Sequence, residues 1–163
     1  MIHLKVYNID LQQELEQFFE TCFTDLGWSY EPNGRHSDIA NITNSYMSNG
    51  CFWCLYDGIR LIGTVAVRTI DIENKIAELK RFYVLKEEQG YGHGSMLFKT
   101  ALNYAKENKF HKICADTRND RYVSQHIMRK HGFEEVSRYN DNKYAELFFE
   151  LELNAYELSI LYR

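Results

Sequence analysis

The sequence predicts one α+β domain with a mostly antiparallel sheet. Two turn signals, Asp57-Gly58 and Glu73-Asn74-Lys75, separate three apolar runs and predict a strand meander. Helical periodicity recurs on both sides of this meander, and the chain offers only one strand–helix–strand unit. The 163 residues are 45% hydrophobic, which is enough for one core, so residues 1–163 are expected to form a single domain.

The first part of the chain predicts a strand and two helices. A short strand is expected over 2–8. A helix follows, because Asp10 can cap it and apolar residues recur at helical spacing as far as Phe23. The loop 27–35 contains the only proline of the chain, and a weaker helix is expected to begin at Ser37.

The middle of the chain predicts the meander and a long helix. The three strands of the meander are expected over 51–56, 61–70 and 76–85, with the two turn signals between them. Apolar residues at helical spacing predict a helix over 96–108. A short apolar strand over 112–116 follows it.

The last part predicts one more helix and a hairpin. The helix covers about 120–130, and Gly132 can adopt the left-handed conformation that ends a helix. Two strands, 134–139 and 144–153, are expected on either side of the turn cluster 140–142.

A glycine-rich turn, Gln-Gly-Tyr-Gly-His-Gly-Ser over 89–95, joins the third meander strand to the long helix. Free backbone N–H groups and the helix dipole at such a turn favour a phosphate or pyrophosphate. A Walker loop would need a lysine where this chain has Ser95-Met96. A dinucleotide fingerprint accepts Gly90 and Gly92 but needs a third glycine where Ser95 stands, so a nicotinamide-dependent enzyme is a weaker alternative.

Counted from its glutamine, the turn reads Q-x-x-G-x-G over 89–94 and resembles the signature of the GNAT superfamily of N-acetyltransferases. Three further segments resemble the family in the same order: GTVA at 63–66, ELKRFYV at 78–84 and MRKHGF at 128–133. The resemblance implies a GNAT-like fold, in which a twisted, mostly antiparallel mixed sheet of about seven strands is flanked by about four helices.

The resemblance also implies acetyl-CoA as co-substrate. Backbone amides of the turn would hold its pyrophosphate, and the bulged strand before the turn would pair with the pantetheine arm. The matching positions are Phe82, Tyr83, Val84, Gln89, Gly90, Tyr91, Gly92, His93, Gly94, Ser95 and Asn119. Counting back from the Gly-Phe pair puts the family's usual asparagine at Arg121 rather than Asn119, so both residues are candidates.

The implied reaction is direct attack of a primary amine on the thioester in a ternary complex. The ammonium must first lose a proton, and Glu78 matches the base of some family members. The alternative for Glu78 is a solvent-facing carboxylate paired with Lys80. The tyrosine that commonly protonates the thiolate would fall at Met128. The possible substitutes are Tyr122, Tyr139 and His126.

The function implied is that of an acetyl-CoA-dependent N-acetyltransferase acting on a small-molecule or peptide amine. Because the usual acid is missing, the alternative is a non-catalytic acyl-CoA sensor or interaction module with the same fold. Trp28, Tyr30 and His36 fall where the variable acceptor wall of the family lies. A homodimer is possible, because family members often dimerise.

Composition excludes several other classes. Lys and Arg number 19 against 23 Asp and Glu, without a long run of either sign, which argues against nucleic acid as the main partner. The sequence lacks a secretion signal and a bilayer-spanning stretch, so a cytoplasmic location without membrane contact is expected. Cys51 and Cys54 point to opposite faces of one strand, so reduced thiols are expected rather than a metal site.

Overall fold

The computed structural model describes residues 1–153, and seven strands form one sheet in the order β1-β2-β3-β4-β5-β7-β6. The strands are β1 (Ile2–Val6), β2 (Gly50–Asp57), β3 (Arg60–Asp71), β4 (Ile76–Val84), β5 (Lys112–Thr117), β6 (Glu134–Val136) and β7 (Leu147–Glu152). Neighbouring strands run antiparallel except β4 and β5, which are parallel. The predicted mixed, mostly antiparallel sheet of seven strands is confirmed.

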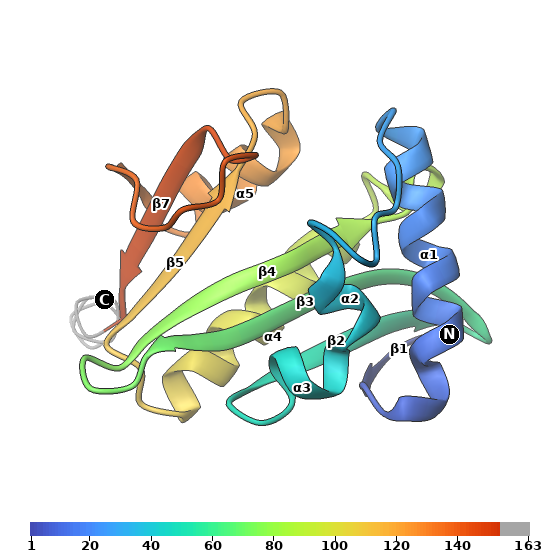
Figure 1. Cartoon of the computed structure of the whole chain (residues 1–163), viewed down its shortest axis with the longest axis horizontal. Coiled ribbons are helices and arrows are strands. Elements are labelled where there is room, and N and C mark those ends of the chain that lie inside the picture. Colours follow the sequence, from blue (N-terminus) through green and yellow to red (C-terminus); the bar gives the residue numbers. More distant parts are fainter. Residues whose placement is uncertain (154–163) are drawn as a thin grey trace.

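Five α-helices flank this sheet within residues 1–153. They are α1 (Gln12–Asp25), α2 (Ser37–Ala40), α3 (Ile42–Tyr46), α4 (His93–Glu107) and α5 (Tyr122–Lys130). Figure 1 shows α1, α2 and α3 in front of the sheet and α4 behind it. Gly132 adopts the predicted left-handed conformation after α5, with φ of 91°.

Two details of the helices differ from the sequence prediction. The first helical segment is capped by Asn8, whose side chain accepts from the Asp10 N–H at 3.0 Å, and not by Asp10. The helix predicted from Ser37 is broken into α2 and α3 at Asn41, which leaves the helical conformation. The Asn41 side chain donates to the carbonyl of Ser37 at 2.9 Å, so a side chain satisfies the last turn of α2.

The two last strands are shorter than predicted, because residues 137–146 leave the sheet as a loop. Arg138 donates to the backbone carbonyls of Asn142 and Ala145 at 2.8 and 3.1 Å. These bonds take the place of a strand ladder. The loop folds back over the sheet, and the side chain of Asn140 reaches β4 and β5.

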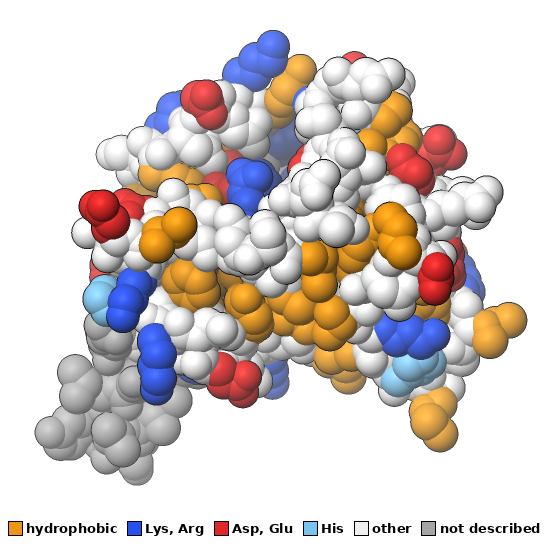
Figure 2. Space-filling model, turned by 60° about the horizontal axis from the view of Figure 1, so that its bottom comes forward, with side chains coloured by type: hydrophobic (Ala, Val, Ile, Leu, Met, Phe, Trp, Pro, Cys, Tyr) orange, Lys and Arg blue, Asp and Glu red, His pale blue; other side chains and the backbone are white. Residues whose placement is uncertain are grey.

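The core lies on both faces of the sheet. The buried stripe of α1 matches the predicted apolar positions and packs through Leu15, Phe18, Phe19, Cys22 and Phe23. On the other face α4 buries Leu97, Phe98, Ala101, Leu102 and Ala105, as predicted. Figure 2 shows apolar side chains gathered in the middle of the lower face of the molecule, with charged side chains around them. The homodimer expected from the family resemblance stays a prediction.

Residues 1–153 contain no helix with both the length and the apolar character that a bilayer crossing requires. The four cysteines are unpaired thiols, of which Cys22, Cys54 and Cys114 are buried and Cys51 is half-buried. Burial raises the pKa of the Cys54 thiol to about 12, which keeps it protonated at neutral pH. Over the same residues, no three His, Cys, Asp or Glu side chains are grouped as a metal site would need.

The feature that positions the site is the divergence of β4 and β5. Their pairing runs from Ile76 opposite Lys112 to Leu79 opposite Ala115 and then stops. Beyond that point β5 remains paired with β7, while β4 remains paired with β3. Figure 1 shows the two strands separating, with β4 running toward α1 and β5 toward α5. The backbone edge of β4 from residue 80 onward therefore has no strand partner on this side.

Candidate active site

A β-bulge interrupts β4 at the point where β5 leaves it. Thr64 of β3 faces Tyr83 and Ala66 faces Lys80, so Arg81 and Phe82 together oppose one residue of β3. Arg81 has a φ of 51°, in the left-handed region, and its carbonyl accepts from the Thr64 hydroxyl at 2.8 Å. The bulged strand expected from the family resemblance is present, and its free edge faces the opening.

One cleft, of about 750 Å³, lies between the end of β4, the glycine-rich turn and α5; we call it the turn cleft. Eight predicted cofactor positions line it: Phe82, Tyr83, Val84, Gln89, Gly90, Gly92, Gly94 and Ser95. Lys86 lines it as well. The turn and the bulged strand, 5 to 13 residues apart in the sequence, therefore form one continuous wall.

Backbone conformation shapes the glycine-rich turn. Gly90 and Gly92 have φ of 87° and 86°, a region that L-residues with a side chain rarely adopt. The helix α4 begins at His93, inside the motif and earlier than the predicted Met96, whose N–H bonds to the Gly92 carbonyl at 3.1 Å. The N–H groups of the first turn consequently have no partner within α4 and are available to a ligand in the turn cleft.

The other predicted cofactor positions, Tyr91, His93 and Asn119, do not line the turn cleft. Tyr91 is exposed, and the His93 ring lies 3.7 Å from the Glu88 carboxylate. The Asn119 amide donates to Glu146 at 2.8 Å, which ties its loop to the approach to β7. Arg121, the other residue that the sequence offered for the Asn119 role, does line the cleft.

A second cleft, of about 500 Å³, opens on the other side of the bulge; we call it the basic cleft for its arginines and lysines. The two clefts share four lining residues: Phe82, Tyr83, Arg121 and Ser124. A molecule bound in one cleft can therefore meet a molecule bound in the other at the bulge. This contact point is the place where a group could pass between them.

Two of the three residues predicted for an acceptor wall lie in the basic cleft. Trp28 and His36 line it, whereas the Tyr30 hydroxyl donates to Glu16 at 2.6 Å and Tyr30 is outside the lining. His36 is buried against the Phe23 ring, and its Nδ1 accepts from the Glu31 N–H at 2.9 Å. Burial, with the charges of nearby arginines, lowers the pKa of His36 to about 4, so the ring is neutral at neutral pH.

A half-buried ion pair fixes the bulge to α2. Arg81 donates two hydrogen bonds to Asp38, at 2.8 and 2.6 Å, and the Tyr46 hydroxyl donates a third at 2.5 Å. Burial alone would raise the pKa of Asp38, but the hydrogen bonds and charge of Arg81 outweigh it and hold the pKa at about 2. The Arg81 side chain is therefore committed to Asp38.

Glu78 lies on β4 shortly before the bulge and is 1% exposed, so it is not the solvent-facing carboxylate of the alternative interpretation. Its partner is Arg68, at 2.8 Å, while Lys80 lies 3.7 Å from Asp116 instead. Glu78 itself does not line either cleft, but Arg68 and Asp116 line the basic cleft.

An amide joins the two carboxylates. The Asn140 side chain donates to Glu78 at 3.1 Å and to Asp116 at 2.7 Å. Tyr139 also donates its hydroxyl to Glu78, at 2.7 Å, and lines neither cleft. Burial and the charges of Glu78 and Asp116 raise the pKa of Tyr139, so this hydroxyl stays protonated.

The remaining predicted acid candidates lie on α5. Tyr122 is 75% exposed and lines the turn cleft with His126, while Met128 is buried and lines the basic cleft. Sequence reasoning missed Ser124, which is buried and lines both clefts. Its spacing gives a usable signal, because residues four apart share one face of a helix and Ser124 precedes Met128 by four.

Comparison with known proteins gives a consistent result. The model of the acetyltransferase (GNAT) family matches residues 9–133. Human N-acetyltransferase 8B is 26% identical over 107 residues, which cover 63% of this chain and 47% of that protein. The chain thus spans about half the length of the curated relatives it matches.

Solved structures agree in fold. An acetyltransferase of the GNAT family from Staphylococcus aureus has a TM-score of 0.85 at 22% identity, covering 94% of this chain and 99% of that one. The spermidine/spermine N-acetyltransferase SpeG from Vibrio cholerae has a TM-score of 0.70 at 18% identity, covering 98% and 99%. At these identities the likeness concerns the fold alone. The family model, which covers most of the chain, decides the assignment: the protein belongs to the acetyltransferase (GNAT) family.

Proposed function

We propose that the protein is an N-acetyltransferase that moves the acetyl group of acetyl-CoA to a primary amine by direct attack in a ternary complex. The observation that carries the proposal is the meeting of the turn cleft and the basic cleft at the β4 bulge. A two-substrate reaction without a covalent enzyme intermediate needs two sites that converge on one point.

The turn cleft is the proposed acetyl-CoA site. Backbone N–H groups at the start of α4 suit the pyrophosphate, since they combine free donors with the positive end of the helix dipole. The free edge of Phe82, Tyr83 and Val84 suits the amides of the pantetheine arm, which would add to β4 as a further strand. Tyr91, His93 and Asn119 do not line this cleft, so they would support the turn and the neighbouring loop without contacting acetyl-CoA.

The basic cleft is the proposed amine site. The amine nitrogen must be neutral to attack the thioester carbonyl, so its proton must leave first. The carboxylates Glu78 and Asp116, which Asn140 joins by hydrogen bonds, are the proposed acceptors of this proton. Asp116 faces the cleft and Glu78 lies behind it, with Tyr139 positioning Glu78 through its hydroxyl.

The CoA thiolate leaves as the amide forms and takes up a proton to become the free thiol. Tyr122 is the proposed donor, because it lines the turn cleft. A thiol with a pKa of about 8.5 is already a fair leaving group, so the donor contributes little to the rate. This explains how the chain can function with Met128 at the position of the usual tyrosine.

Calorimetric titration with acetyl-CoA, with NAD and ATP as controls, tests the first half of the proposal. We expect micromolar binding of acetyl-CoA alone, followed by amine-dependent release of free thiol. Binding without thiol release across a broad amine panel would favour the sensor alternative. Preference for NAD, or no binding of acetyl-CoA, would overturn the proposal.

A further inference from the structure

The basic cleft has a charge opposite to that of the whole chain. The chain carries a net charge of −4, yet seven Lys and Arg residues line this cleft against three Asp residues. A cationic amine would not be drawn to such a cleft. The distribution of these charges within the cleft decides what it can bind.

The cations at the floor of the cleft already have close partners. Arg68 pairs with Glu78 at 2.8 Å, and Arg81 pairs with Asp38 at 2.6 Å. Lys80 lies 3.7 Å from Asp116. These pairs hold the floor together and leave little charge for a ligand.

The cations at the mouth are different, because three guanidinium groups converge on one indole. The central carbons of Arg35, Arg118 and Arg121 lie 5.3, 5.1 and 6.0 Å from the centre of the Trp28 ring. We call these four residues the arginine cluster. Like charges this close repel one another, and the aromatic face compensates only part of the cost.

The acids near the arginine cluster neutralise it incompletely. Arg35 and Arg118 have ion-pair partners at 3.1 and 3.5 Å, but both partner carboxylates are more than half exposed to water. Both contacts are made by the arginine Nε atom, which is buried and does not form a hydrogen bond to the carboxylate. For the Arg121 guanidinium, no ion pair or hydrogen bond is found within residues 1–153. Three guanidinium groups share two carboxylate partners, so the cluster retains net positive charge.

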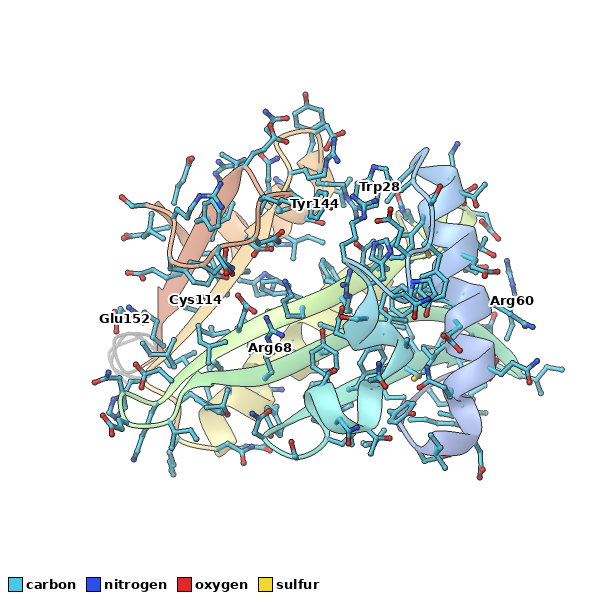
Figure 3. The ribbon with its side chains drawn as sticks, viewed as in Figure 1. Trp28, Arg60, Arg68, Cys114, Tyr144 and Glu152 are labelled. Atoms are coloured by element: carbon cyan, nitrogen blue, oxygen red, sulfur yellow. The ribbon has the colours of Figure 1, made fainter. Side chains whose placement is uncertain are left out.

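The arginine cluster spans the mouth of the cleft. Figure 3 shows Trp28 and Tyr144 approaching each other from opposite sides of the opening between the two halves of the sheet. The Arg35 guanidinium lies between them, 5.3 Å from the Trp28 ring and 4.7 Å from the Tyr144 ring. A ligand held here would extend from the mouth toward the bulge, where we place the acetyl transfer.

We infer that the acceptor is a small primary amine that also carries a carboxylate or phosphate group, and that the arginine cluster binds this anion. The inference rests on the proposed function. Guanidinium groups present paired N–H donors whose geometry matches both anions, and an anion would relieve the repulsion within the cluster. A polyamine would instead bring further positive charge against it.

Matched pairs of amines test the inference by thiol release with acetyl-CoA. L-phenylalanine is compared with L-phenylalaninamide, O-phosphoethanolamine with ethanolamine, and spermidine serves as the polyamine. We expect kcat/KM at least about tenfold higher for the anionic member of at least one pair, as for other charge-assisted hydrogen bonds. The pair that responds distinguishes carboxylate from phosphate.

The variant Arg118→Gln tests whether the arginine cluster causes the preference for anionic amines. Arg118 lines only the basic cleft. Arg121 lines both clefts, so its substitution would affect the binding of both substrates. We expect R118Q to reduce the ratio of kcat/KM for the anionic amine to that for its neutral partner about tenfold, while the affinity for acetyl-CoA, which binds in the other cleft, stays constant. The control is Arg129→Gln, which removes an arginine that contacts Phe149, Glu135 and Gln125 outside both clefts and should leave the anionic preference unchanged.

Three results would overturn the inference. One is equal or better use of spermidine or of the neutral members, which would leave the proposed acetyltransferase function standing. The second is an anionic preference that survives R118Q. The third is the absence of thiol release from every amine in the panel, and if acetyl-CoA also fails to bind, the proposed function fails with it.

Discussion

The turn cleft and the basic cleft meet at one bulge but are built from different parts of the chain. The backbone of β4 and of the glycine-rich turn forms one continuous wall of the turn cleft over residues 82–95, and the end of α1 and residues 120–130 complete it. Charged and aromatic side chains form the basic cleft, from five segments that only the fold brings together: 28–38, 68, 79–83, 116–128 and 141–145. A backbone site can hold one cofactor in many sequences, whereas a side-chain site can change with each acceptor.

The largest expected effect tests whether the turn cleft depends on backbone alone. In Gly92→Leu the side chain would occupy the space beside the turn, so we expect acetyl-CoA affinity to fall at least about 100-fold. Gly58→Leu is the matched control, because both glycines have positive φ and no atom within 4 Å of the position that a Cβ would take. Both variants should lose similar stability in a urea titration, and only G92L should lose binding. Retained affinity in G92L would contradict the assignment of the turn.

The next effect concerns the carboxylates of the basic cleft. Glu78→Gln and Asp116→Asn each keep the shape of the side chain but remove the charge that accepts the amine proton. We expect kcat/KM to fall about 100-fold for the variant that removes the base. Acetyl-CoA affinity should not change, since neither residue lines the turn cleft.

The two carboxylate variants also show which member of the pair accepts the amine proton. A large loss only in D116N would make Asp116 the base and Glu78 its positioning partner. A large loss only in E78Q would show that water carries the proton past Arg68 to Glu78. Activity that stays normal in both variants would remove these carboxylates from the mechanism.

A third prediction concerns the ion pair that fixes the bulge to α2. The pKa of Asp38, about 2, lies below its unfolded value of about 3.9, so the group stabilises the fold above that value and its contribution is lost as the pH falls through about 2. We expect Asp38→Asn to cost about 2–3 kcal/mol at pH 7 by urea denaturation and to flatten the acid limb of the stability curve. Asp141→Asn, at the cleft mouth, should cost less than about 0.5 kcal/mol. Equal losses of stability in both variants would mean that the ion pair of Asp38 with Arg81 does not stabilise the fold.

The same contrast explains what the sequence predicted well. The meander followed from its turn residues, and the turn cleft followed from a glycine pattern that reflects backbone conformation directly. Tyr91 and His93 were included with the turn because sequence proximity does not reveal which way a loop side chain points. The last strands were predicted too long because Asn140 and Arg138 bond across the loop, and such distant bonds leave no periodic signal.

Most of the basic cleft could not be predicted from the sequence, for the same reason. The ion pair of Arg81 could not be predicted because its partner Asp38 is 43 residues away, on a segment with no motif. An exposed Glu78 was a fair alternative because alternation along a strand cannot show that a loop from residues 137–146 covers it. The arginine cluster draws on a loop after α1 and on the end of β5, and neither segment signals the other.

The smallest expected effect belongs to the two tyrosines that the sequence offered in place of the usual acid. Tyr122→Phe should lower kcat by no more than about threefold, since the CoA thiolate needs little help to leave. Tyr139→Phe removes a hydrogen bond to Glu78, so it should instead lower kcat/KM by less than about tenfold with acetyl-CoA affinity unchanged. A fall in kcat of about 100-fold for Y122F would contradict this and make Tyr122 a true general acid. The turn cleft would then contribute a reacting side chain, and the division between a backbone site for the cofactor and a side-chain site for the chemistry would no longer hold.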